Sequence, residues 1–277
     1  MIKNKIVWLA FFTMVAFAAN SILCRLALKN TLIDPITFTT IRLLSGILVL
    51  GMIGITQGKI SLHSGSWLSS LALFFYALFF SLSYVTLPAG VGAILLFGSV
   101  QISMISYGLI KKERFNGVQL MGLLMAIVGL GILFLPGVTT PPLLGSLMML
   151  ISGLSWGIYS LRGKGSKNPL DDTFGNFLRT APLIVIVLFI NGTKSHFDYH
   201  GAIYAVLSGG IASAVGYSVW YIVLPKLKAI FAATIQLTVP IFASLASIVL
   251  LDEVITLKLT LASFLVLLGT GVVIVKK

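Results

Sequence analysis

Ten long apolar stretches run through this sequence, and they restrict its fold more than any other feature. They cover residues 6–24, 35–55, 67–87, 89–110, 117–135, 142–161, 174–190, 201–224, 230–251 and 259–275. Each stretch is close to the roughly 20 residues that an α-helix needs to cross a hydrocarbon core about 30 Å thick. Together they occupy most of the 277 residues, which leaves no room for a soluble domain. We therefore expect an all-α, polytopic membrane protein of ten transmembrane helices.

The composition excludes two alternatives to a helical membrane protein. Apolar side chains make up 58% of the chain and charged ones only 9%, too few to cover a soluble protein. A transmembrane β-barrel would alternate polar and apolar residues in segments of about ten, whereas these stretches are continuously apolar. The first stretch follows Lys3 and Lys5 as in a signal peptide, but it is longer than the roughly 7 to 15 apolar residues of a cleaved signal. We interpret it as the first transmembrane helix.

The formal charge of +12 is divided unevenly between the two sides of the membrane. If the N-terminus is cytoplasmic, the cytoplasmic segments hold Lys3, Lys5, Lys59, Lys111, Lys112, Arg114, Arg162, Lys164, Lys167, Lys226, Lys228, Lys276 and Lys277. The opposite side holds Arg25, Lys29, Lys194 and Lys258. Short loops rich in Lys and Arg stay in the cytoplasm, so we predict a multi-pass protein of the bacterial inner membrane with both termini cytoplasmic. The charge then reflects topology and contact with the lipid bilayer, not a nucleic-acid partner.

An internal repeat divides the chain into residues 1–137 and 138–277. A shift of 140 residues aligns Ala89 with Ala229 and Gly129 with Gly269, and slightly shorter shifts align other motifs of the two halves. Each copy contains five apolar stretches, and because five is odd the second copy must enter the membrane from the opposite side. Inverted repeats of this kind are typical of secondary transporters, in which the two halves exchange conformations around a central site.

Several motifs of both halves resemble one transporter family. In the second half these are the run Gly216 to Pro225 (GYSVWYIVLP), Pro240-Ile241-Phe242-Ala243, Leu251-Asp252-Glu253 and Gly269-Thr270-Gly271; in the first half they are Phe17 to Ser21, Arg42-Leu43 and Lys112-Glu113. The sequence is similar to the EamA family of the drug/metabolite transporter superfamily over almost its whole length. The resemblance implies that the first, third, fourth, sixth, eighth and ninth helices surround the pathway. Because members of the family carry very different metabolites, the resemblance names no substrate.

Polar and aromatic residues on these helices are the candidate substrate-binding residues. They are Asn20, Tyr76, Tyr84, Trp156, Tyr159, Tyr217 and Trp220, together with the amides Gln101 and Gln236. A polar group that faces lipid without a partner costs several kcal/mol, so these side chains should point into the bundle. The alternative for each of them is ordinary helix packing, with amides bonded between helices and tyrosines at the headgroup level.

Two arginines and one proline are further candidates inside the spans. Arg42 and Arg179 each lie about 12 Å from a helix end, a depth at which a charge is a functional candidate by default. Either guanidinium is suited to an anionic group of the substrate, although its long side chain can equally reach an interface or a backbone carbonyl. Pro240 removes a backbone hydrogen bond within the ninth stretch, and we predict a kink there that shapes a gate.

The acidic residues are expected at the membrane boundaries. All seven lie in loops or at helix ends, which argues against proton-coupled export of organic cations through a central carboxylate. Glu113 and Glu253 end the fourth and ninth stretches, and we predict that they form gate latches with Lys112, Arg114 or Lys258. Proton coupling through these two glutamates stays open.

The favoured function is a secondary transporter that exports small polar or zwitterionic metabolites such as amino acids. It would work by alternating access across the inner membrane. The alternatives are a passive facilitator or channel with the same fold, and a membrane-embedded enzyme that acts on lipid-linked substrates. The enzyme is disfavoured because no H-E-x-x-H motif or metal-spaced cluster is present and Cys24 is the only cysteine. We expect no cofactor and no metal, and the oligomeric state is left open.

Overall fold

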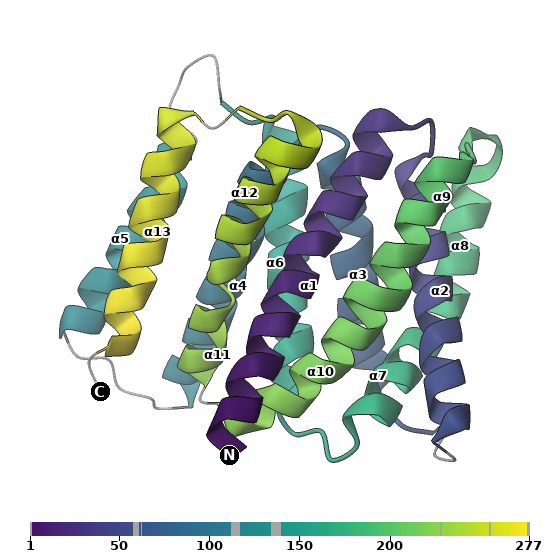
Figure 1. Ribbon diagram of the computed structural model, residues 1–277, viewed down its shortest axis with the longest axis horizontal. Coiled ribbons are helices and arrows are strands. Elements are labelled where there is room, and N and C mark those ends of the chain that lie inside the picture. The colour runs from purple at the N-terminus through teal and green to yellow at the C-terminus, as the bar shows by residue number, and fades with distance from the viewer. Residues whose placement is uncertain are drawn as a thin grey trace.

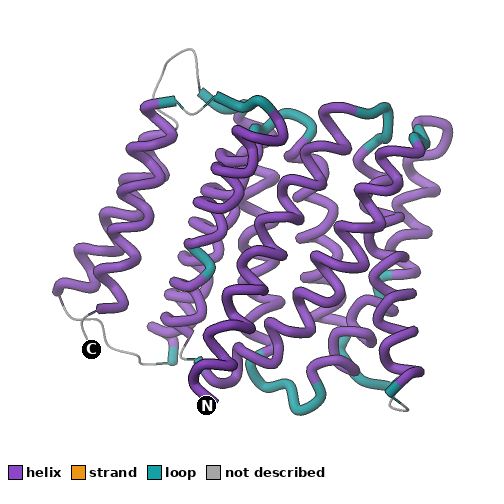
Figure 2. Tube along the Cα trace, viewed as in Figure 1, coloured by secondary structure: helices purple, strands orange, loops and turns teal. Residues whose placement is uncertain are grey.

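The protein is a bundle of roughly parallel helices in a computed structural model. The structure describes residues 2–57, 61, 63–111, 117–133, 140–227, 229–254 and 256–275, and every regular element among them is helical (Figure 2). The elements are α1 (Ile2–Asn30), α2 (Pro35–Thr56), α3 (Trp67–Tyr84), α4 (Ala89–Ile110), α5 (Gly117–Leu133), α6 (Leu143–Gly163), α7 (Pro169–Leu178), α8 (Ala181–Asn191), α9 (Tyr199–Val206), the π-helix η2 (Leu207–Val215), α10 (Gly216–Val223), α11 (Ala229–Ile235), α12 (Thr238–Leu251) and α13 (Leu257–Val275). Short 3₁₀ turns η1 (Gly192–Lys194) and η3 (Leu224–Lys226) follow α8 and α10.

The helices confirm a multi-pass membrane protein. Seven helical segments of the described chain are long and apolar enough to cross a bilayer, and shorter apolar helices cover Gly117–Gly129, Thr238–Leu251 and Leu257–Gly269. Large apolar side chains face outwards; Leu48, Phe189 and Val249, for example, are 66%, 87% and 78% exposed. A surface of this kind is stable against lipid and not against water. The ten predicted stretches thus correspond to ten helical passages, of which three are composed of broken helices.

Two of the breaks precede a proline. α7 ends at Leu178 and α8 begins at Ala181, next to Pro182, while α11 ends at Ile235 and α12 begins at Thr238, before Pro240. A proline ring clashes with the carbonyl four residues earlier, which for Pro240 is the carbonyl of Gln236. That oxygen instead accepts a tighter bond from the amide of Val239 at 3.1 Å. The kink predicted at Pro240 is therefore present as a break one turn before it.

The bundle has two ends and one separate helix pair. The N-terminal end of α1 and the C-terminal end of α13 lie at the same end, here called the termini end, and the opposite end is called the far end (Figure 1). α5 and α13 pack together at one edge of the bundle, beside α4 and α12 (Figure 1). The remaining helices surround the interior in which most predicted site residues lie. The inverted relation between the two halves stays a prediction.

Candidate substrate site and its closure

Aromatic and polar side chains from five helices meet in the interior of the bundle. We call this set the central cluster; it consists of Phe17 and Asn20 of α1, Arg42 of α2, Tyr76 of α3, Trp156 of α6 and Tyr217 of α10, all of them buried. Trp156 is at its centre, because its ring lies 4.6 Å from that of Tyr217, 4.9 Å from Tyr76 and 5.1 Å from Phe17. The cluster brings together four of the residues predicted from the sequence to bind substrate, and Arg42 as the fifth.

Side-chain hydrogen bonds connect the cluster to neighbouring helices. The Asn20 amide donates to the Tyr76 hydroxyl at 3.0 Å and accepts a bond from the Ser208 hydroxyl of η2. The Trp156 indole donates to the Gln236 amide oxygen at 2.7 Å, and Gln236 in turn donates to the Ala232 carbonyl of α11 at 3.1 Å. Gln236 therefore joins the cluster at its edge, at the break between α11 and α12.

Arg42 is the charged member of the cluster, and its side chain is only 1% exposed. Its Nη2 donates to the hydroxyls of Tyr217 at 2.8 Å and Tyr76 at 3.2 Å, and its Nε donates to the Ser213 hydroxyl at 3.2 Å. The guanidinium also lies over two rings, 4.9 Å from the centre of Phe80 and 5.2 Å from that of Tyr76. Nη1 is buried and has no hydrogen-bond partner among the described residues. Hydroxyls and rings thus hold this charge without a carboxylate.

The π-helix η2 brings Ser208 and Ser213 to the cluster, and the sequence pattern did not reveal it. Its wider turn accommodates one extra residue per turn, a local distortion that is frequent at functional sites. Gly209 permits its close contact with α2, since a Cβ there would lie 1.9 Å from the carbonyl oxygen of Arg42. A run of apolar and small residues has the same appearance in α- and π-helices, so only the two adjacent glycines hinted at this approach.

Two stacked tyrosines lie between the cluster and a polar pocket at the termini end. Tyr159 lies 5.5 Å from Trp156 and 5.1 Å from Tyr221, whose hydroxyl donates to the Tyr159 carbonyl at 3.1 Å. Tyr221 also lines the pocket, which has a volume of about 230 Å³. The other lining residues are Gly65, Ser66, Ser69, Arg162, Gly163, Gly165, Ser166, Asp172 and Asn176. Trp220 is buried beside this layer, and its indole donates to the Ser160 hydroxyl at 3.3 Å.

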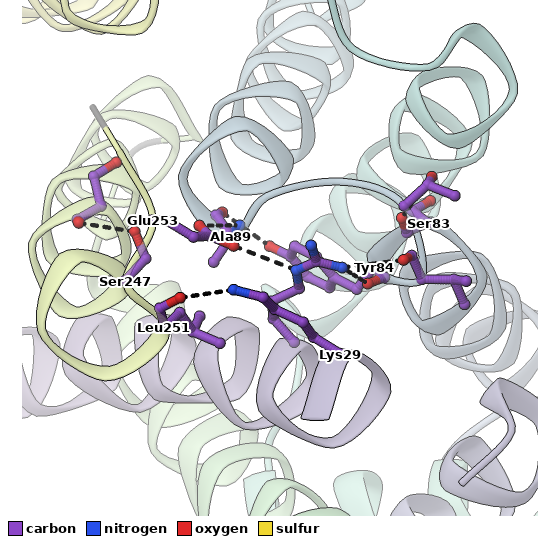
Figure 3. A network of polar contacts seen from close by, with 11 residues as sticks. Lys29, Ser83, Tyr84, Ala89, Ser247, Leu251 and Glu253 are labelled. Atoms are coloured by element: carbon purple, nitrogen blue, oxygen red, sulfur yellow. Dashed lines mark hydrogen bonds and ion pairs between the residues drawn. The ribbon is translucent and has the colours of Figure 1, made fainter. Parts of the chain in front are cut away.

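At the far end, a network of charged contacts joins α1 to α3, α4 and α12 (Figure 3). Arg25 pairs with Glu253 at 3.3 Å, and the other carboxylate oxygen of Glu253 accepts a bond from the amide of Ala89 at 2.8 Å. Arg25 also donates to the Tyr84 carbonyl at 2.8 Å, and Lys29 donates to the Leu251 carbonyl at 2.7 Å. We call these contacts the far-end closure; it holds the one salt bridge found between described residues.

At the closure, Glu253 has a partner that the sequence did not indicate. Its carboxylate pairs with Arg25, 228 positions away in the chain. Arg25 was not among the predicted site residues, and the available signal was a cation in the last part of the first helix. Glu113, the other predicted latch, lies with Lys112 and Arg114 outside the described residues.

Three other predicted site residues have their polar contacts outside the central cluster. Tyr84 is buried at the far-end closure, and its hydroxyl donates to the Ala89 carbonyl at 3.4 Å. Gln101 donates to the Ala233 carbonyl and so links α4 to α11. Arg179 follows the last residue of α7 and donates to the backbone carbonyls of His63, Ser64 and Gly175. These contacts correspond to the packing alternatives considered for Gln101 and Arg179.

Comparisons with known proteins agree with this architecture. Residues 4–135 and 143–275 each match the model of the EamA-like transporter family. An uncharacterized protein of Pseudomonas aeruginosa is 45% identical over 96% of this chain and 93% of its own, and an uncharacterized transporter of Archaeoglobus fulgidus is 28% identical over 73% and 74%. A solved crystal structure superposes with a TM-score of 0.71 over 98% of this chain and 97% of that one at 16% identity, which shows a shared fold. The chain therefore belongs to the EamA-like transporter family, and its helices identify it as a multi-pass membrane protein.

Proposed function

We propose that this protein is a secondary transporter that exports small polar or zwitterionic metabolites, such as amino acids, across the bacterial inner membrane by alternating access. The main support is the buried cluster of polar and aromatic side chains in the middle of the bundle, which is enclosed towards both ends. Arg25 and Glu253 close the far end, and the buried, stacked rings of Tyr159 and Tyr221 separate the cluster from the polar pocket at the termini end. A central site with a barrier on each side that can open in turn is what alternating access requires.

The predicted topology gives this arrangement a direction. If the termini are cytoplasmic, the polar pocket faces the cytoplasm and the far-end closure faces the periplasm. In this conformation Tyr159 and Tyr221 separate the cluster from the pocket, and both side chains are buried. A solute then enters from the cytoplasm when this tyrosine layer opens, and export follows when the layer is closed and the far-end closure opens. We propose residues 1–137 and 138–277 as the inverted repeats whose relative movement performs this exchange, supported by the two separate matches to the family model.

Flux into proteoliposomes tests the proposal. Purified protein is reconstituted and supplied with labelled amino acids, amines and nucleosides, with and without an imposed proton gradient. Saturable flux of at least one solute is expected, and it should fall at least tenfold in Trp156→Ala because the ring at the centre of the cluster is lost. Trp8→Ala is the matched control, since Trp8 is 71% exposed on the outer surface.

The outcomes separate the remaining alternatives. Saturable flux that is faster in the presence of the proton gradient supports a coupled carrier. Saturable flux whose rate does not depend on the gradient supports the passive facilitator. If folded protein moves none of these solutes, the proposed function is wrong. If Trp156→Ala transports as well as Trp8→Ala, the proposed site is wrong. The family assignment points to a transporter and away from the enzyme on lipid-linked substrates.

A further inference from the structure

The charge of Arg42 has no acidic partner in its surroundings. The acids of the described chain lie at helix ends: Asp34 and Asp198 precede α2 and α9, Asp171 and Asp172 are in the first turn of α7, and Asp252 and Glu253 follow α12. None of them accepts a hydrogen bond from Arg42 or forms a salt bridge with it. A buried charge normally requires a counter-charge, because its desolvation costs several kcal/mol. The cluster is therefore one negative charge short.

The cluster is also short of hydrogen-bond acceptors. The hydroxyl oxygen of Tyr76 lies within 3.0 to 3.2 Å of three donors, from Arg42, Asn20 and Tyr217, although it has only two lone pairs. If Tyr76 instead donates its own proton to Tyr217, the Tyr217 proton has no acceptor among the described contacts. Nη1 of Arg42 adds further unused donors. No backbone carbonyl accepts a bond from the Arg42 guanidinium in the described chain, so its unused donors are available to another molecule.

We propose that Arg42 binds the carboxylate of the transported solute, with the Tyr76 and Tyr217 hydroxyls as additional donors. A carboxylate supplies both things that the cluster lacks, a negative charge and several lone pairs, in the planar form that matches the guanidinium fork. One unpaired cation balances one negative charge, which favours a carboxylate over a phosphate dianion. The Trp156 and Phe17 rings lie against the Tyr217 ring and would contact the apolar part of the solute. The inference rests on the proposed function and restricts its substrates to carboxylate-bearing solutes.

Binding to the solubilised full-length protein tests this inference without transport. The probes are L-leucine and L-phenylalanine, each compared with its amide, which lacks the negative charge, and with the amine that lacks the carboxyl group. The fluorescence of Trp156 and Trp220 reports binding, because both rings lie beside Phe17 of the cluster. We expect saturable binding of at least one acid. Its amide and amine should bind with an affinity lower by about tenfold or more, because they lose hydrogen bonds to a charged group.

Variants assign the effect to Arg42. Arg42→Gln should lose the preference for the acid, and Arg42→Lys should retain part of it because it keeps the charge but not the fork. Lys194→Gln removes an exposed cation from the 3₁₀ turn η1 and should leave the preference unchanged. Size-exclusion chromatography and thermal unfolding show whether Arg42→Gln folds. If it does not, the comparison of acid, amide and amine on the unmodified protein still tests whether the site requires a carboxylate.

Three results would overturn the inference: equal binding of acid, amide and amine; an acid preference that survives in folded Arg42→Gln; or no saturable binding of either acid. The outcomes for the proposed function differ from these. Acid-selective binding without flux in proteoliposomes would reject the transporter and keep the carboxylate site. Saturable flux of uncharged or cationic solutes in preference to acids would reject the carboxylate site and keep the transporter.

Discussion

Neutralising Glu253 should open the far end of the bundle. Its carboxylate pairs with Arg25 at 3.3 Å, where the two side chains are only 11% and 12% exposed, and it also accepts the Ala89 amide at 2.8 Å. Glu253→Gln keeps an oxygen for the Ala89 amide but loses the charge. A hydrogen bond to a charged group contributes about 1.5–3 kcal/mol, and because a neutral bond remains we expect a loss near the lower value. About 1.5 kcal/mol corresponds to a roughly tenfold increase in the open population.

The only cysteine of the chain provides the assay. Cys24 immediately precedes Arg25 on α1 and is fully buried. Its rate of reaction with a polar maleimide, measured on purified protein in detergent, therefore follows the fraction of time that the closure is open. Labelling in Glu253→Gln should be roughly tenfold faster than in the unmodified protein.

Asp252→Asn is the matched control for the labelling experiment. It also removes one negative charge, and its backbone lies in the left-handed region with a φ of 51°, which asparagine tolerates well. Asp252 is exposed, so we expect its labelling rate to equal that of the unmodified protein. Equal rates for Glu253→Gln and Asp252→Asn, with complete labelling after denaturation, would refute the assignment of Glu253 to the closure.

Two further predictions concern stability. Gly209→Ala should lower the free energy of unfolding by about 1–3 kcal/mol, since its Cβ would lie 1.9 Å from a carbonyl oxygen of α2. Gly131→Ala is the control and should not lower it, because the space around its Cβ is open. Thermal unfolding in detergent compares the two variants. Burial raises the pKa of Asp34, but hydrogen bonds from Thr37 and His196 outweigh it and hold the pKa below its ordinary value. The charged form therefore stabilises the fold above the ordinary pKa of an aspartate and loses this effect as the pH falls through the lowered one. The unfolding temperature of the unmodified protein should exceed that of Asp34→Asn at neutral pH, and the difference should shrink in that acidic range.

The sequence predicted the helices well because their signal is local. The long apolar runs correctly indicated α2 and α4, and Pro240 correctly indicated the break that precedes it. The approach of η2 to α2 was not predictable in this way, since it depends on packing between segments far apart in the chain. The same reason explains why Arg25 was missed as the partner of Glu253.

The two arginines show how much the position in the fold adds to a sequence repeat. Arg42 and Arg179 align in the two halves, and the sequence offered no reason to treat them differently. Arg42 lies within the continuous helix α2 and reaches the hydroxyls of Tyr76 and Tyr217. Arg179 lies at the end of the short helix α7, where free backbone carbonyls are near, and it donates to those. The break at this point changes the surroundings of the second arginine from a cluster of side chains to a loop.

The helices that share residues between the cluster and the closure indicate which parts can move. α1 contributes Asn20 to the cluster and Arg25 to the closure, and α3 contributes Tyr76 and the Tyr84 carbonyl in the same way. Each helix therefore couples the two sites as a rigid body, and α1 and α3 must move together if the cluster is to stay intact. Glu253 instead follows α12, which contributes no side chain to the central cluster.

The break before Pro240 allows α12 to move without disturbing the cluster. Gln236 lies at the break and is held by the Trp156 indole at 2.7 Å, while Glu253 lies beyond the other end of α12. A rotation of α12 about the break separates Glu253 from Arg25 and leaves the bond between Gln236 and Trp156 in place. Arg25 also binds the carbonyls of Tyr84 and Val85, so its loss loosens α1 from α3 as well. Glu253→Gln should accordingly open the far end and preserve solute binding. Arg25→Gln should weaken both the far-end closure and solute binding.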